Sequence, residues 1–246
     1  LYEKDFDINF NEDTKSSRKR GVEVFILSKY QPSFVKLFSS GGNLGYENSF
    51  MIIGFDNMLI ANCYCQAGSR FSVGQEKIHI HYSRCRYQQY KTMYNELLRL
   101  RGDRNIPIVI TGDFNTNLNG SPEEWRELKF IYETRLNDAW FVHHKGNISE
   151  HPGNTEDTDT NYMRWNFKFM EKHFRYDGFL YDKGVRVDDI KVIGDIPIPL
   201  NPTQSDAMKK LWIPEGNDEK IKYNDMGTLD LFPSDHYGVC VTFVLE

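Results

Sequence analysis

The chain has 246 residues, of which 39% are hydrophobic and 14% aromatic, and its formal net charge is −5. This content suffices for one large hydrophobic core, and the acidic balance excludes a global basic field, so a nucleic-acid partner would need a local patch. We expect no membrane span, since no run approaches about 18 apolar residues. Segment 1–20 is polar, starts at Leu1 rather than methionine and shows no secretory signal. We therefore expect an intracellular protein, given as a fragment or a processed form.

The first half of the chain is predicted to hold strands, a hairpin and a helix. The helix is indicated by an apolar stripe at spacings of three and four residues: Tyr90, Met93, Tyr94, Leu97 and Leu98. In chain order, we expect a linker or surface segment at 1–20, a strand at 21–30, a turn at 39–45, hairpin strands at 50–55 and 58–65 around Asp56-Asn57, a polar loop at 66–82 and the helix at 83–101.

The second half is predicted to alternate strands with long polar loops. A helix should open at Ser121-Pro122, because Ser121 is a good N-cap and Glu124 completes a capping box. We expect loops at 144–162 and 200–228 and strands at 174–182, 185–193 and 237–245. Long loops on a rigid scaffold often border a binding site. Many short strands with two clear helices indicate an α/β sandwich of two packed mixed sheets with outer helices, a single domain over 21–246.

The run Ile106-Pro107-Ile108-Val109-Ile110-Thr111-Gly112-Asp113-Phe114-Asn115 organises this prediction. Its apolar part is typical of a strand buried on both faces. Gly112 permits a sharp turn, and Asp113 and Asn115 then project from the carboxyl end of the strand, where α/β proteins usually place their chemistry.

Two later runs have the same character of polar residues against a strand. One is Arg175-Tyr176-Asp177-Gly178-Phe179, and the other is Ser234-Asp235-His236 before the last strand. Either motif alone also occurs in an ordinary hydrogen-bonded turn. Their order along the chain resembles the endonuclease/exonuclease/phosphatase superfamily, whose motifs are GDxN, R-x-D-x-[IF] and SDH. The resemblance covers roughly residues 21–246 and implies a four-layer, deoxyribonuclease I-like sandwich.

Within that superfamily, the C-terminal part is most similar to the 5′-tyrosyl-DNA phosphodiesterases. The short matches are Asn137-Asp138-Ala139-Trp140, Arg164-Trp165-Asn166 and Phe232-Pro233 before the Ser-Asp-His run. The resemblance implies Trp165, Arg175, Tyr64 and Cys63 as substrate-binding residues.

The chemistry of phosphodiester hydrolysis and the resemblance together assign roles to the polar residues. Such a reaction needs a divalent metal, an activated water and donors for the growing phosphoryl charge. Asp113 would hold or deprotonate the water, and Asn115 and His236 would donate to the phosphate. Asp177 would orient His236, and Asp235, with Asp113, would support Mg²⁺, for which Mn²⁺ is the alternative.

Two departures from the family pattern bear on activity. The family carries an Asn and a metal-binding Glu on two strands that would lie upstream, and segment 1–20 resembles neither strand. The first strands and the Glu are therefore expected to be omitted here, supplied by a partner chain or lost. Cys63 stands where the family has a phosphate-contacting His or Tyr, with Tyr64 beside it.

The sequence thus favours an Mg²⁺-dependent phosphodiesterase acting on nucleic acid or a related phosphate ester, with a 5′-tyrosyl-DNA adduct among the candidate substrates. The alternative is a catalytically degenerate member of the fold that serves as a binding or scaffold subunit. A zinc or thiol enzyme built on Cys63, Cys65, His79 and His81 is a third reading, but their spacing matches no common site. Reduced cysteines are expected throughout.

Overall fold

The computed structural model describes residues 24, 26–39, 49–68, 76–161, 163, 172–212, 223, 224 and 226–246. The predictions for segment 1–20 and for Trp165 fall outside these ranges. In the part of the chain that the structure describes, no helix is long and apolar enough to cross a membrane.

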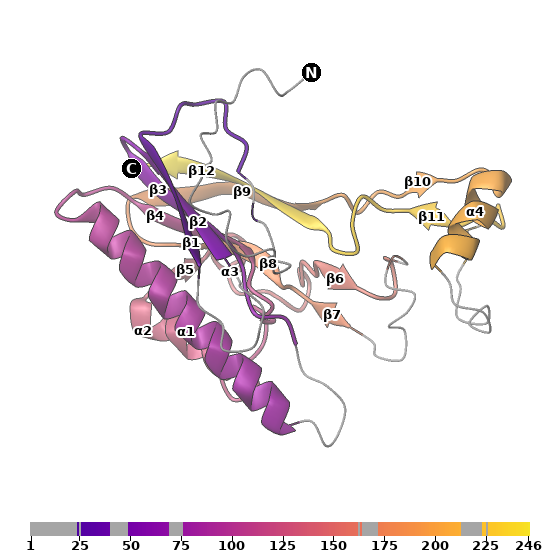
Figure 1. Cartoon of the computed structure of the whole chain (residues 1–246), viewed down its shortest axis with the longest axis horizontal. Helices are drawn as coiled ribbons and strands as arrows, with labels where there is room; N and C mark the ends of the chain where they lie inside the picture. Colours follow the sequence, from indigo (N-terminus) through magenta and orange to yellow (C-terminus); the bar gives the residue numbers. More distant parts are fainter. Residues whose placement is uncertain are drawn as a thin grey trace, which may run out of the picture.

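A mixed six-stranded sheet forms the centre of the molecule, with the strand order β1-β2-β3-β4-β8-β5 (Figure 1). β3 and β4 run parallel because a long helix connects them, and the other neighbours are antiparallel. The strands are β1 (Phe34–Ser39), β2 (Ser49–Phe55), β3 (Met58–Tyr64), β4 (Ile108–Asp113), β5 (Asn137–Asp138) and β8 (Asp177–Tyr181).

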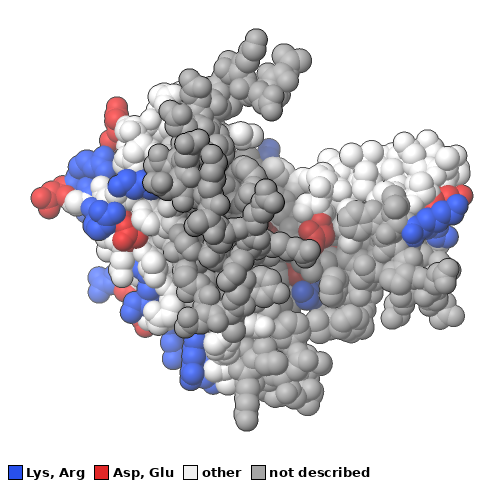
Figure 2. All heavy atoms as spheres, in the orientation of Figure 1, with Lys and Arg blue, Asp and Glu red and all other residues white. Residues whose placement is uncertain are grey.

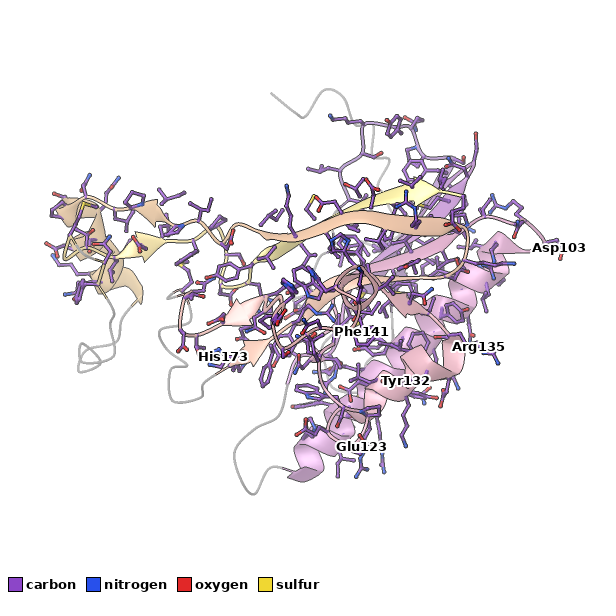
Figure 3. The ribbon with its side chains drawn as sticks, turned by 180° about the vertical axis from the view of Figure 1, so that it is seen from behind. Asp103, Glu123, Tyr132, Arg135, Phe141 and His173 are labelled. Atoms are coloured by element: carbon purple, nitrogen blue, oxygen red, sulfur yellow. The ribbon has the colours of Figure 1, made fainter. Side chains whose placement is uncertain are left out.

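Helices cover one face of this sheet. The predicted stripe of α1 (Glu76–Arg101) buries Tyr90, Met93 and Leu97 against inward residues of the sheet. A short 3-10 turn, η2 (Arg126–Leu128), and α2 (Lys129–Thr134) pack beside it. The outer side of α2 carries Tyr132, which is labelled in Figure 3 and is 69% exposed.

A second sheet covers the opposite face. It consists of the long antiparallel strands β9 (Val185–Ile193) and β12 (Gly238–Leu245) in the described residues. Its inner side chains form a core with the large sheet and with α3 (Ala139–His143): Val109, Trp140, Tyr181, Val185, Val187 and Ile190, flanked by Val239, Val241 and Phe243. The predicted α/β sandwich of two packed sheets with an outer helix layer is therefore present.

Two hairpin-like pairs extend from the sandwich (Figure 1). β6 (Glu156–Asp157) pairs with β7 (His173–Phe174) close to the start of β8. β10 (Ile198–Pro199) and β11 (Asp230–Leu231) carry α4 (Pro202–Trp212) away from the main body. The Ser-Asp-His run therefore joins the projecting pair to β12.

Several predicted elements are wrong in detail. The described residues 26–30 are irregular, and the first strand is β1 instead. At Ser121 the hydroxyl accepts the amide of Glu124 at 3.4 Å, as a cap would, but the chain forms a turn before η2 rather than a regular helix. α1 begins at Glu76, inside the predicted loop 66–82. The prediction missed these first turns because they are too polar to show an apolar stripe.

The predicted loop 200–228 contains α4, and a local signal marks where that helix begins. Asn201 accepts the amide of Gln204 at 2.9 Å, and the Gln204 side chain accepts the amide of Asn201 at 3.1 Å. This reciprocal pair is a capping box, followed by Pro202 at the first helical position. The Asn-Pro-Thr-Gln sequence therefore marks the start of α4, although the polar composition of the segment led to the prediction of a loop.

The carboxyl end of β4 depends on Gly112. Its φ of +124° is rarely adopted by residues with a side chain, and an ideal Cβ there would lie 2.0 Å from the carbonyl oxygen of Cys63 on β3. Gly102 also has a positive φ, +56°, but a Cβ there would meet nothing within 4 Å.

We expect Gly112→Ala to lower the free energy of unfolding by at least about 3 kcal/mol, because backbone strain and a steric clash add up. Gly102→Ala, with strain but no clash, should cost about 1 kcal/mol. Urea denaturation of both variants measures the difference. Equal losses would show that the close approach of β3 and β4 is not rigid.

Candidate functional site

Two carboxylates face each other where β4 ends and β8 begins. Asp113 and Asp177 are partners in the antiparallel register of these strands, so their side chains lie on the same face of the sheet. Val109 on β4 and Tyr181 on β8 belong to the core under the second sheet and fix that face as the one between the two sheets. The predicted motifs on β4 and β8 therefore meet at one edge of the sandwich.

His236 joins this pair from the turn that precedes β12. Its Nδ1 lies 2.9 Å from Oδ2 of Asp177 in a hydrogen-bonded ion pair whose side chains are 16% and 22% exposed. Asp113, Asp177 and His236 each offer one atom that could bind a metal, and these three atoms lie within 4.8 Å of one another. Three of the four predicted catalytic residues are thus gathered at one point from segments far apart in the sequence.

The fourth, Asn115, holds the carboxylate of Asp113. Its backbone N–H donates to Oδ1 of Asp113 at 2.7 Å, and its side-chain amide donates to Oδ2 at 2.9 Å and to the carbonyl of Cys65 at 3.0 Å. The residue has a φ of +50°, in the left-handed region that asparagine tolerates better than most residues. In this structure its amide hydrogens orient Asp113.

The surroundings shift the protonation of both acid and imidazole. Burial and then the facing Asp177 carboxylate raise the pKa of Asp113 to about 7. Burial alone would lower the pKa of His236. The hydrogen bond that its ring donates to Asp177, together with the charges of Asp177, Asp113 and Glu156, raises this pKa to about 9. At neutral pH the imidazole is therefore a cation, while Asp113 is poised between its two forms.

The start of β6 and the residue before it supply neighbours that the sequence did not single out. Glu156 is fully buried and pairs with Lys172 through both carboxylate oxygens, at 3.1 and 3.2 Å. Thr155, also fully buried, accepts hydrogen bonds from the chain at the start of β8. The predicted loop 144–162 does border the site, although no motif identified these two residues.

The structure separates Tyr64 from Cys63. Tyr64 is the parallel partner of Asp113, so it shares the face of the acids, whereas Cys63 pairs with Gly112 and lies in the core under the helices. Its hydrogen bond with Cys65 and its burial raise the pKa of the Cys63 thiol well above the usual range. Strand alternation therefore points Cys63 away from the face that carries the acids, and of the two residues only Tyr64 shares that face.

Arg175 is also placed differently from the prediction. Its guanidinium is buried, binds both carboxylate oxygens of Asp138 at 3.1 and 2.5 Å, and donates to Asn119 at 3.0 Å. Asp138 in turn caps α3 through the amide of Trp140. This arginine is therefore committed to the fold instead of facing a ligand.

The donor chemistry of the cluster fits a divalent cation. Carboxylate oxygens are the ligands that Mg²⁺ and Mn²⁺ prefer, and two of them face each other here beside one imidazole. Asp235, the other predicted metal carboxylate, is half-buried next to His236 and accepts from Ser234 at 3.3 Å, and it is not part of the cluster.

The charges around the site are of both signs. Figure 2 shows described residues of both charges, mainly along the left rim and at the right end of the view. A second, more exposed group of possible ligands, Asp157, Asp159 and His173, lies on the β6–β7 pair, where Figure 3 labels His173.

Comparison with known proteins places the fold. No protein-family model and no curated protein matches the sequence. Among solved structures, a mannosyl-6-phosphatase of Bacteroides thetaiotaomicron is similar with a TM-score of 0.53 and 14% identity, over 87% of this chain and 67% of its own. An endonuclease/exonuclease/phosphatase family protein of the same organism gives 0.55 and 13%, over 88% and 64%.

TDP2 of C. elegans is similar with a TM-score of 0.52 and 15% identity, over 87% of this chain and 51% of its own. The chain therefore spans less than two thirds of the length of two of these three structures. At such low identity the likeness establishes the architecture. The chain shares the fold of these structures, one of which is an endonuclease/exonuclease/phosphatase family protein, and this is the architecture that its motifs predict.

The raised pKa of His236 predicts a pH-dependent stability. A protonated histidine with a folded-state pKa of about 9 stabilises the fold fully below its ordinary pKa of 6.5, and this stability is lost as the pH rises through about 9. In metal-free protein we expect the free energy of unfolding to fall by roughly 2–3 kcal/mol across this window. Asp113, raised from 3.8 to about 7, gives its own loss mostly at lower pH.

Urea titrations in EDTA at several pH values measure this dependence, with His236→Asn as the reference variant. The variant should lose most of the slope above pH 6.5, because it lacks the titrating group. An unchanged slope would mean that other groups titrate there and that the Asp177 pair contributes little.

The burial of Arg175 predicts a structural phenotype. Arg175→Met leaves the Asp138 carboxylate without its guanidinium partner and should destabilise the fold by about 3–5 kcal/mol. Arg84→Met, at an exposed position of α1, should change stability by less than about 0.5 kcal/mol. Thermal and urea unfolding compare the two. A stable Arg175→Met protein with weakened substrate binding would restore the predicted binding role instead.

Proposed function

We propose that this protein is a divalent-metal-dependent phosphodiesterase that hydrolyses a phosphodiester in nucleic acid or a related phosphate ester. The observation that carries the proposal is the convergence of Asp113, Asp177 and His236 at one edge of the sandwich, with ligand atoms within 4.8 Å. The architecture supports it, because the similar structures named above include a phosphatase and an endonuclease/exonuclease/phosphatase family protein.

The side chains divide the work as follows. Asp113 is the proposed carboxylate ligand of Mg²⁺, with Mn²⁺ as the alternative, and Asp235, which lies outside the cluster, would support the ion through its water shell. When bound, the cation neutralises phosphoryl charge and lowers the pKa of water. Asp113 orients the attacking water and accepts its proton.

His236 stabilises the charge that grows on the phosphoryl oxygens. Its Nδ1 proton is directed to Asp177, so the Nε2 proton is left to donate to the substrate, and its raised pKa keeps the ring cationic. As water oxygen bonds to phosphorus, the bond to the leaving oxygen breaks, and that oxygen departs with its electron pair. Tyr64 and Trp165 are the proposed substrate contacts.

A substrate with one accessible phosphodiester fits better than a long duplex. The formal net charge is −5, and tight non-specific duplex binding needs clustered cations. A D. rerio TDP2 structure, with a TM-score of 0.50 and 15% identity over 86% of this chain and 67% of its own, holds a single-strand DNA product. We propose a 5′-tyrosyl-DNA end as the first substrate to test, which would place the protein in DNA repair.

The second candidate function is a scaffold subunit that has lost catalysis. It is favoured by the smaller sheet, which has two strands in the described residues and so offers edges to further strands from a partner chain. The free cysteines fit an intracellular location for either function.

Purified full-length protein should release product with Mg²⁺ from at least one of four substrates: 5′-tyrosyl-oligonucleotide, single-stranded DNA, RNA or a phosphoinositide. Asp113→Asn should lower the rate by at least about 10³-fold, because water activation and charge stabilisation fail together. The matched control is Asp188→Asn, which changes a half-exposed acid on β9 and should retain the wild-type rate.

No product from any substrate, together with copurifying partners whose binding survives Asp113→Asn, would reject the enzyme and favour the scaffold.

A further inference from the structure

Thr155 lies at a junction that neither the motifs nor the proposed roles include. It stands just before β6, in the polar stretch between α3 and the start of β8, and its side chain is fully buried. A buried hydroxyl is tolerated when it finds hydrogen-bond partners, so its contacts show what it is for.

The hydroxyl of Thr155 holds the first residues of β8. Its Oγ1 accepts the backbone N–H of Tyr176 at 3.0 Å and the backbone N–H of Asp177 at 3.1 Å. Both lone-pair directions of the oxygen are thus used on the chain that carries the Asp177 carboxylate.

The backbone of the same residue holds the segment that carries the histidine. The carbonyl oxygen of Thr155 accepts the N–H of Tyr237, the residue after His236, at 2.7 Å. Its own N–H donates to the carbonyl of Phe174 at 2.9 Å. One residue therefore binds the chain on both sides of the Asp177–His236 hydrogen bond.

The rest of this segment braces the histidine turn further. The buried side chain of Asn161 donates to the carbonyl of Ser234 at 2.9 Å, and the hydroxyl of Tyr237 donates to Thr160 at 2.9 Å. Residues 155–161 thus contact the turn on both sides of His236, with Thr155 as the member that also reaches Asp177.

We propose that Thr155 is a positioning residue for the Asp177–His236 pair, an inference that rests on the proposed function. Threonine suits this task because its β-branched side chain is stiff and its oxygen can accept two bonds at once. Valine has nearly the same shape but leaves two buried N–H groups unsatisfied, which the chain relieves by moving. That movement shifts Asp177 relative to His236.

The test compares Thr155→Val, Thr155→Ser and Thr158→Val in the full chain. Serine keeps the accepting oxygen. Thr158→Val removes a buried hydroxyl from the same segment, one that is bonded to Lys172 rather than to the pair. Two quantities are measured: the ¹⁵N chemical shifts of the His236 ring in metal-free protein at fixed pH, and kcat and KM on the substrate that wild type hydrolyses. Asp177→Asn defines the shifts of an unpaired ring.

We expect Thr155→Val to move the His236 nitrogen shifts most of the way toward those of Asp177→Asn. It should also lower kcat about 10²-fold with KM changed less than about threefold, as a misplaced catalytic group does. Thr155→Ser and Thr158→Val should resemble wild type in both measurements.

Wild-type ring shifts in a folded Thr155→Val protein would overturn the proposal. If that variant does not fold, Thr155→Ser decides, since unpaired-type shifts in a protein that keeps the hydroxyl would also overturn it. The ring shifts need no turnover. A wild-type protein that hydrolyses nothing would therefore reject the proposed function and still leave the positioning of His236 measurable.

Discussion

The hydrogen bond between Asp177 and His236 is the contact on which the site depends. Asp177 opens β8 in the large sheet, and His236 precedes β12 in the small one, so their 2.9 Å bond ties the two sheets at one edge. The acids there outnumber the cations: Asp113, Asp177 and Glu156 face His236 and Lys172. Burial and then this excess of negative charge raise the pKa of Asp113, and a divalent cation would neutralise the charge.

The fold can hold such a site because β4 changes character along its length. Ile108, Val109 and Ile110 are buried against the cores on its two faces, and the strand then ends in Gly112 and Asp113, which are only half-buried. The buried Arg175–Asp138 pair is closed by hydrogen bonds, as burial of ions requires. In the buried Arg86–Glu127 pair, Nε of Arg86 contacts Glu127, but Nη2 has no hydrogen-bond partner in the described part of the chain.

The sequence was informative where an apolar run meets a turn signal. The hairpin at Asp56-Asn57 and the two motif ends at Asp113 and His236 lie where local patterns predict them. It was uninformative about contacts between distant segments. No pattern shows that Arg175 pairs with Asp138, and whether Cys63 or Tyr64 faces the site follows from the pairing of β3 with β4. Thr155 stands out only once its four hydrogen-bond partners are known.

The strain at this edge bears on the choice between enzyme and scaffold. Asn115 adopts a left-handed backbone with a φ of +50°, and the half-buried Asp113 faces the like charge of Asp177, so both features destabilise the fold. A scaffold gains nothing from either, and a neutral residue in place of Asp113 would remove the repulsion. Asn115 donates two hydrogen bonds to the Asp113 carboxylate and one to the carbonyl of Cys65, so the strained residue holds the repelled one in place. Such local destabilisation, compensated by specific contacts, is typical of functional sites. The geometry therefore favours the enzyme.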